Sequence, residues 1–253
     1  MQFMQIHIIM IVTSCVIYER AKDLLPHYYK HYANLGVDKF CFGIFGDEKC
    51  HLWQEVKEFG EGLDVEISQI GNEYPFDMFL EGDFITRIRD SMKTTDWLVP
   101  TDLDEFHVVE GYNTFQQLQK DCEDEKADYV WSVTFDRVRA DGAIPPSIDS
   151  SVPIWEQFPQ MCRLTDTIAK AYCRKLCMVR QNILVSGGHH MVDKGYKKFS
   201  KEGITHHFKW FGDLHSRETT KVKNFETQNY KWIDENRRVI HFLETCNGNL
   251  LRQ

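Results

Sequence analysis

Three carboxylates follow directly on a short apolar run in DWLVPTDLDEF, at residues 96–106. If this stretch is extended, Asp102 and Asp104 point to the same side of the chain while Leu103 points to the other. Two carboxylates on one side repel each other unless a cation or a proton lies between them. Carboxylate oxygens suit Mg²⁺ or Mn²⁺, which keep open positions for phosphate oxygens. The stretch therefore predicts a metal-bound diphosphate, and the alternative is a solvated turn that caps the next helix.

Two pairs of adjacent histidines offer nitrogen ligands. His189 and His190 follow two glycines, and His206 and His207 precede Phe-Lys-Trp. A single histidine is more often a surface group or a hydrogen-bonded core group. On a strand, His206 and His207 face opposite sides, so at most one of them points at a metal. An imidazole ligand shifts the metal preference from Mg²⁺ towards Mn²⁺, and the other members of the pairs are then supporting or packing groups.

Basic and aromatic side chains complete the set that could bind a diphosphate and a sugar. Arg87, Arg89 and Lys175 could hold phosphate oxygens, and each could equally be a solvated surface charge. Four aromatic side chains could stack on apolar sugar faces or pack in the core instead; they are Trp155, Phe158, Trp210 and Phe211.

The elements that must position these residues alternate between strand and helix patterns. Apolar or alternating runs predict strands over 7–16, 37–45, 63–70 and 96–102, and helical periodicity predicts a helix between each pair. The order β-α-β-α-β-α-β predicts an α/β fold with a mostly parallel sheet flanked by helices. Ligands of such sheets gather at the carboxyl ends of the strands, where the acidic stretch lies.

The second half of the chain is less regular. Strand patterns recur at 128–135, 175–180 and 204–210, and residues 214–253 predict a small helical segment. The proline-containing span 136–170 predicts a long loop, which in a compact domain is usually functional.

Composition excludes some classes of partner. The formal net charge of -8 argues against binding of free nucleic acid through its phosphate backbone. Eight cysteines without a C-x-x-C pair indicate reduced thiols and a cytoplasmic location. The opening residues lack a basic region and a run of 18 apolar residues, so we expect no transmembrane segment, which leaves peripheral membrane association open.

Several motifs in the same order resemble the GT-A nucleotide-sugar glycosyltransferases, in particular bacterial-type members of family 2. They are YER and LGVDKF near the start, DWLVPTDLDEF, DRVRADG, WEQFP, the lysine of KLCMVR, GGHH and HHFKW. The resemblance covers about residues 8–220 and implies a GT-A, Rossmann-like fold. It implies a domain over 1–213, with a nucleotide-sugar-binding half at 1–106 and an acceptor and metal half at 107–213, followed by the helical segment 214–253.

The resemblance also implies the reaction and its residues. A sugar would move from a nucleotide-diphosphate sugar, such as a UDP-, GDP- or dTDP-sugar, to the hydroxyl of a glycan or other acceptor, with inversion. Mn²⁺ or Mg²⁺ would be held by Asp102, Asp104 and His207, with His190 in reserve. Residues expected at the nucleotide-sugar donor are Glu19, Arg89, Asp102, Lys175 and His190.

The acceptor hydroxyl needs a general base across from the diphosphate, so Asp102 and Asp104 are not candidates for it. Candidates in the irregular span are Asp136, Asp141 and Glu156, with Asp136 narrowly preferred. Simple alternatives are an ion pair with a neighbouring arginine for Asp136 and a surface loop charge for Glu156.

Two other functions share these features. A sugar-phosphate nucleotidyltransferase has the same sheet order, but it needs a Gly-rich loop and a basic residue after the first strand, and TSCVIYER has no such loop. A non-catalytic sugar-binding or metal-binding module is the third reading, and the intact Asp102, Asp104 and His207 argue against it.

Overall fold

The fold is that of a computed structural model, which describes residues 9–17, 23–46, 48–71, 78–192, 194–228, 230, 232–246 and 248–251. Its strands are β1 (Ile11–Ile17), β2 (Lys39–Phe45), β3 (Val65–Gly71), β4 (Trp97–Pro100), β5 (Glu105–Val108), β6 (Tyr129–Val138), β7 (Gln160–Cys162), β8 (Arg174–Arg180) and β9 (Gly203–His207). Its α-helices are α1 (Leu25–Asn34), α2 (His51–Phe59), α3 (Met78–Ser91), α4 (Phe115–Asp124), α5 (Ile154–Gln157), α6 (Leu214–Gln228) and α7 (Ile233–Thr245), and two further helical turns are η2 (Thr165–Ala169) and η3 (Gly187–His189).

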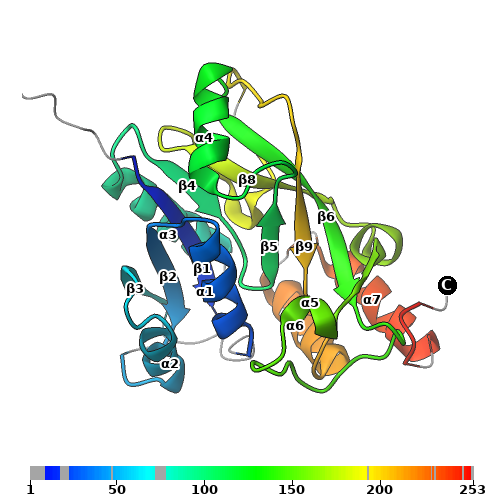
Figure 1. The fold of residues 1–253 in the computed structure, drawn as a ribbon. Helices are drawn as coiled ribbons and strands as arrows, with labels where there is room; N and C mark the ends of the chain where they lie inside the picture. The colour runs from blue at the N-terminus through cyan, green and yellow to red at the C-terminus, as the bar shows by residue number, and fades with distance from the viewer. Residues whose placement is uncertain are drawn as a thin grey trace, which may run out of the picture.

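The nine described strands form one sheet in the order β3-β2-β1-β4-β8-β6-β9-β5, with β7 paired to β6. In Figure 1, β1, β2 and β3 lie on the left and β5, β6 and β9 on the right. Strands β3, β2, β1 and β4 are parallel, and so are β6 and β9. Strand β8 runs antiparallel to both of its neighbours, and β5 and β7 run antiparallel to theirs. The predicted α/β fold, with helices flanking the sheet and a helical C-terminal segment, is confirmed, and the parallel pairing is concentrated in its first half.

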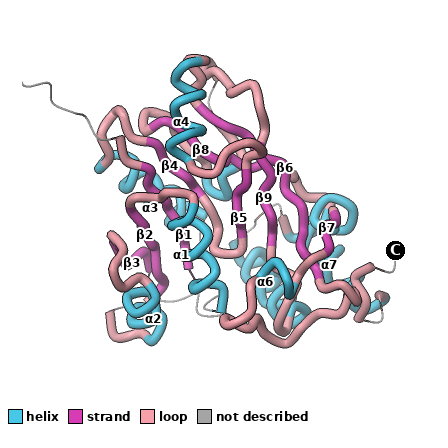
Figure 2. Tube along the Cα trace, viewed as in Figure 1, coloured by secondary structure: helices cyan, strands magenta, loops and turns pink. Residues whose placement is uncertain are grey.

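Strand β1 is buried along its whole length because helices cover both faces of the sheet. Ile11 and Cys15 pack in one apolar cluster with residues of α1 and α2, whereas Val12 and Val16 pack in a second cluster with residues of α3. Figure 2 shows α1 and α3 on opposite sides of β1 and β2. The central parallel strands are thus held rigidly by packing on both faces, and their carboxyl ends are fixed relative to one another.

Strand β5 follows the acidic stretch and was missed by the sequence pattern. It pairs with β9, so that Glu105 lies opposite His207 and Phe106 lies opposite His206. The pairing is long in range and brings the acidic stretch directly beside the second histidine pair.

The span 136–170 contains more regular structure than the expected long loop. Strand β6 extends to Val138 and pairs there with β7, and α5 and η2 lie on either side of β7. The predicted loop is confirmed for residues 139–153, and the prediction is wrong where β6, α5, β7 and η2 form.

The C-terminal helices α6 and α7 pack against each other, and α7 also contacts η2. Beyond α7, Asn249 forms a bridge with Ala143, in the turn after β6. Among the helices that the structure describes, none is both long enough and apolar enough to cross a membrane. All eight cysteines are free thiols.

Candidate functional site

The acidic stretch is a tight turn between β4 and β5, and not the extended chain that was expected. The backbone N–H of Thr101 donates to Ser14 and continues the ladder from β1, and the N–H of Glu105 then donates to the carbonyl of Asp102, 3.0 Å away. The Thr101 hydroxyl donates to the carbonyl oxygens of Asp102 and Glu105. The turn therefore holds Asp102 and Asp104 at the carboxyl edge of the parallel strands, as predicted, but by a different backbone geometry.

A buried lysine meets two of the three carboxylates. Lys175, on β8 and only 7% exposed, places its Nζ 3.0 Å from Oδ2 of Asp102 and 2.9 Å from Oε1 of Glu105. Burial alone would raise the pKa of Asp102, but the Lys175 ammonium and His189 outweigh it and hold that pKa below its usual value. Burial raises the pKa of Glu105 to about 7, although Lys175 opposes the shift. Lys175 is therefore the local cation that allows these side chains to lie together.

His207 is the corresponding cationic partner of Asp104. Its Nε2 lies 3.5 Å from Oδ2 of Asp104, and its Nδ1 lies 3.3 Å from Oδ1 of Asp136. Burial alone would lower the pKa of His207, but the two carboxylates raise it to about 9. Asp102 and Asp104 thus each have their own cationic partner, so mutual repulsion does not by itself require a metal at this turn.

Asp136 is enclosed and its oxygens already accept several hydrogen bonds. It has no exposed surface, and it accepts from the backbone N–H of Thr165 at 2.6 Å, from the Thr165 hydroxyl at 2.7 Å and from Nε1 of Trp210 at 2.8 Å. Burial alone would raise its pKa, but His207 and the other donors lower it to about 2. This geometry suits a group that orients His207 better than a base that receives a proton from an acceptor.

The other two candidates for the base lie on the surface. Asp141 is exposed in the turn after β6, where the Arg139 guanidinium donates to both of its oxygens at 3.0 and 2.9 Å. Glu156 is exposed on the short helix α5. The structure therefore separates the three carboxylates, and only Asp136 lies within the cluster around the β4–β5 turn.

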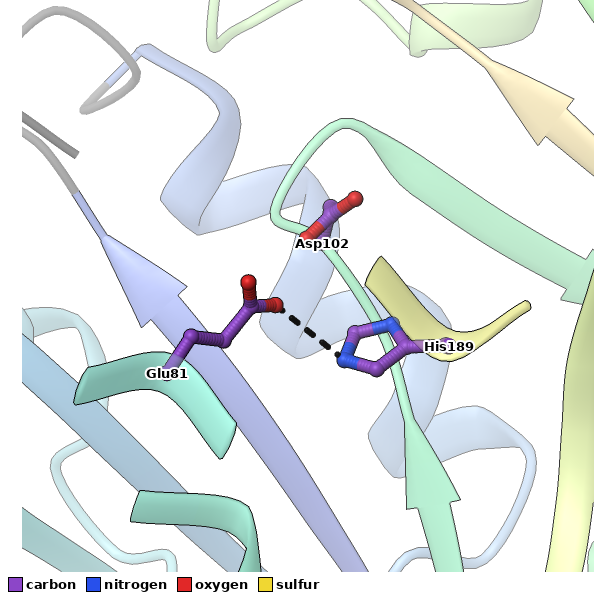
Figure 3. A group of neighbouring side chains, drawn as sticks. All are labelled: Glu81, Asp102 and His189. Carbon is purple, nitrogen blue, oxygen red and sulfur yellow. Dashed lines mark ion pairs between the residues drawn. The ribbon is translucent and has the colours of Figure 1, made fainter. Parts of the chain in front are cut away.

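Glu81, Asp102 and His189 come together from three distant segments, as Figure 3 shows. One ligand atom of each lies within 4.8 Å of the other two, and among the described residues this is the one group of three that could hold a metal ion. His189 Nε2 and Glu81 Oε1 are 3.4 Å apart. Burial raises the pKa of Glu81 to about 8 and lowers that of His189 to about 3, so burial favours the neutral form of both side chains. The expected set Asp102, Asp104 and His207 does not form such a group in this conformation.

The sequence predicts no role for Glu81 and only a supporting or packing role for His189. Glu81 lies in a helix that its apolar stripe predicts, and a single glutamate in such a helix carries no signal. His189 stands out in the sequence only as one member of GGHH. Their meeting depends on the packing of α3 against η3, which no local pattern shows.

Of the other expected donor-binding residues, Arg89 lies away from this cluster and His190 makes its hydrogen bond to the backbone of β8. Glu19 lies outside the described residues. Arg89 is near the far end of α3, about 12 Å along the helix from Glu81 at 1.5 Å per residue, and its guanidinium pairs with Asp90. His190 directs Nδ1 to the carbonyl oxygen of Arg174 at 2.7 Å, which ties η3 to β8.

Most of the aromatic candidates are core residues. Phe158, Trp210 and Phe211 are at most 5% exposed, so packing accounts for them and they offer no face to a sugar. Trp155 is partly exposed, and its ring meets those of His206 and Phe208 edge to face. Of the four, Trp155 alone keeps the proposed acceptor-stacking role.

Comparison with known proteins gives no family. No protein-family model matches the chain, and no curated protein sequence matches it. Among solved structures, the mannosyltransferase PcManGT from Pyrobaculum calidifontis in complex with GDP-Man and Mn²⁺ is 10% identical over 91% of this chain and 69% of that one, with a TM-score of 0.40.

Two further structures show the same degree of likeness. TarS from S. aureus is 9% identical over 93% of this chain, with a TM-score of 0.39, and the match spans 43% of the TarS chain. A 4-diphosphocytidyl-2C-methyl-D-erythritol synthase is 7% identical over 69% of this chain and 76% of that one, with a TM-score of 0.35. Likenesses at this level assign neither a family nor a reaction.

Proposed function

We propose that the protein is a metal-dependent glycosyltransferase that moves a sugar from a nucleotide-diphosphate sugar to an acceptor hydroxyl with inversion. The observation that carries the proposal is that several side chains able to bind a metal lie around the β4–β5 turn. Asp102 and Asp104 stand at the carboxyl edge of the parallel strands, and Glu81, His189 and His207 reach the same edge from α3, η3 and β9. This edge is where open α/β sheets bind their ligands.

The charges of the cluster suit a diphosphate that arrives with a divalent ion. Lys175 already contacts Asp102 and Glu105, and His207 contacts Asp104, so each of these two buried cations is engaged by carboxylates rather than held ready for a phosphate. A divalent ion on Asp102 would add the positive charge that holds the diphosphate and stabilises it as the sugar leaves. From the sequence, Asp104 and His207 are expected to bind the same ion, but in this conformation they pair with each other, and Glu81 and His189 are the side chains close enough to share an ion with Asp102.

The general base remains a proposal among the three expected carboxylates. Asp136 would have to exchange its contacts with Thr165, Trp210 and His207 for a contact with the acceptor. Asp141 and Glu156 are exposed, and Asp141 is also paired with Arg139. In the conformation described, we expect Asp136 to position His207.

Donor hydrolysis tests the proposed function. The tag-free protein is incubated with UDP-, GDP- and dTDP-sugars in Mn²⁺, in Mg²⁺ or in EDTA, and release of nucleoside diphosphate is measured. We expect release from at least one donor in Mn²⁺, loss of it in EDTA, and a loss of at least about 100-fold in Asp102→Asn. Asp234→Asn, an exposed aspartate on α7, is the matched control and should match the wild type.

The opposite outcomes are equally concrete. No release from any donor, or release that persists in EDTA and in Asp102→Asn, contradicts the proposal. Formation of pyrophosphate from a nucleoside triphosphate and a sugar phosphate would instead identify a nucleotidyltransferase.

A further inference from the structure

We propose that Glu81, Asp102 and His189 form a divalent metal site separate from the Asp104–His207 pair. Their ligand atoms lie within 4.8 Å of one another although they come from α3, the β4–β5 turn and η3. In Figure 3 the Glu81 carboxyl group and the His189 ring face each other, with Asp102 across from both. The proposal deepens the proposed function by naming ligands for its ion, but metal binding here does not depend on that function.

Two of the three proposed ligands have a buried polar atom without a hydrogen-bond partner among the described residues. Glu81 is 2% exposed and His189 is 1% exposed. Oε2 of Glu81 and Nδ1 of His189 find no hydrogen-bond partner among the residues that the structure describes. Buried polar groups in native proteins are nearly always paired, and each exception calls for a bound ion, a water or a functional reason. An ion bound by both carboxyl oxygens of Glu81 would give Oε2 a partner, whereas Nδ1 of His189 is not the ring nitrogen that faces Glu81 and would stay unpaired.

The backbone at His189 is held in a conformation that a non-glycine residue rarely adopts. Its φ is 60°, directly after Gly188 at 73°. The turn is fixed by a hydrogen bond from the His189 N–H to Ser186 and by one from the Gly188 N–H to the Glu81 carboxyl group. Left-handed residues of this kind are concentrated at functional sites, where the surrounding structure maintains the strain. Here the strained turn aims the imidazole at Glu81.

The donor set selects the class of ion. The 3.4 Å between His189 Nε2 and Glu81 Oε1 equals the separation of two ligands about 2.1 Å from a tetrahedral ion. One imidazole and two carboxylates suit Mn²⁺ or Zn²⁺ better than Ca²⁺. The Asp102 side chain is 31% exposed, which leaves that side of the ion open to a further ligand. Lys175 competes for Asp102, so the ion must displace it or use the other carboxylate oxygen.

Direct metal binding by the tag-free, EDTA-stripped chain tests the site. Mn²⁺ is titrated and followed by loss of the free-ion EPR signal, and Co²⁺ is followed by its visible absorption. The variants are Glu81→Gln, and His189→Asn, since asparagine tolerates a positive φ. We expect one ion per chain and at least a 10-fold weaker affinity in each variant, as for loss of a ligand.

Two further variants distinguish the new site from the expected one. Asp104→Asn and His207→Gln should each leave Mn²⁺ affinity within about 3-fold of the wild type, and so should His215→Asn, an exposed histidine on α6. Circular dichroism and a thermal melt confirm that each variant is folded.

Two results overturn the assignment. One is an Mn²⁺ affinity that falls in Asp104→Asn and His207→Gln but is unchanged in Glu81→Gln. Donor hydrolysis in Mn²⁺ could still be observed in that case, so this result would refute the metal site without refuting the proposed function. The other is a wild-type chain that binds no Mn²⁺ or Co²⁺ at millimolar concentration.

Discussion

Replacing Lys175 by methionine tests the electrostatic organisation of the cluster. The ammonium is the shared partner of Asp102 and Glu105, at 3.0 and 2.9 Å, in a place where the lysine is 7% exposed. Removing one partner of a buried ion pair costs about 3–5 kcal/mol because it leaves an uncompensated charge. Asp102 is partly exposed and Glu105 can take up a proton, so we expect the lower end, about 3 kcal/mol at pH 7.

The pH dependence of this cost gives the prediction its sign. With its pKa raised to about 7, Glu105 keeps its proton in the folded state while the unfolded chain releases it near pH 4.5. In the wild type this carboxyl group therefore makes the free energy of unfolding fall as the pH rises from 4.5 to 7, and the loss stays constant above pH 7. Without Lys175 the pKa of Glu105 rises further. The free energy of unfolding of Lys175→Met therefore continues to fall above pH 7, by about 1.4 kcal/mol per pH unit. The destabilisation should thus be larger at pH 8 than at pH 6.

Urea unfolding at pH 6, 7 and 8 measures this difference. Lys198→Met removes an exposed lysine that pairs with Glu202, and it should cost less than about 1 kcal/mol at every pH. Lys175→Met combined with Glu105→Gln should recover part of the lost stability, since the buried carboxylate is then absent. A cost below about 1 kcal/mol, or one that is equal at pH 6 and pH 8, would refute the account.

Three further predictions concern single side chains. His107 is fully buried, and burial lowers its pKa to about 3, so this side chain stays neutral in the folded state while it is protonated near pH 6.5 in the unfolded chain. In His107→Gln the fall in unfolding free energy from pH 6 to pH 4 should therefore be shallower by about 1.4 kcal/mol per pH unit. An unchanged slope would be inconsistent with this. In Asp136→Asn the His207 pKa, about 9 in the wild type, should fall by at least about one unit in an NMR titration, whereas no change would remove Asp136 as the group that holds it. Phe158→Ala should destabilise the fold by about 3–5 kcal/mol in urea because the ring is fully buried, and a loss under about 1 kcal/mol would reopen a surface role.

The first half of the fold could be predicted because its signals are local. The apolar run of β1 and the helical stripe of α3 each report burial directly, and alternation of the two fixes the parallel order. Strand β5 could not be predicted, because its four residues follow a turn and gain their partners only from β9, about a hundred positions later. Pairing between strands that lie so far apart in the chain produces no local hydrophobic periodicity in the sequence.

The candidate site was predictable in its parts but not in its pairings. The sequence marks Asp102, Asp104, Lys175 and His207 as residues that could do chemistry, and the structure brings all four to one edge of the sheet. Repulsion between Asp102 and Asp104 does not by itself require a metal, because β8 and β9 each place a cationic side chain at the turn, and the sequence does not show this pairing. Glu81 could not be predicted for a related reason: in the sequence, a buried glutamate on a helix cannot be distinguished from an exposed one.

Thermal unfolding with nucleotide sugars tests the central claim most directly, because a ligand stabilises only the fold that binds it. A donor present at 100 times its Kd adds about 2.7 kcal/mol, which raises Tm by several degrees for a chain of this length. We predict such a rise with at least one nucleoside-diphosphate sugar in Mn²⁺, no rise in EDTA, and none in Asp102→Asn. If no donor raises Tm in Mn²⁺, or if Asp102→Asn shows the full rise, this edge of the sheet does not bind a metal and a diphosphate.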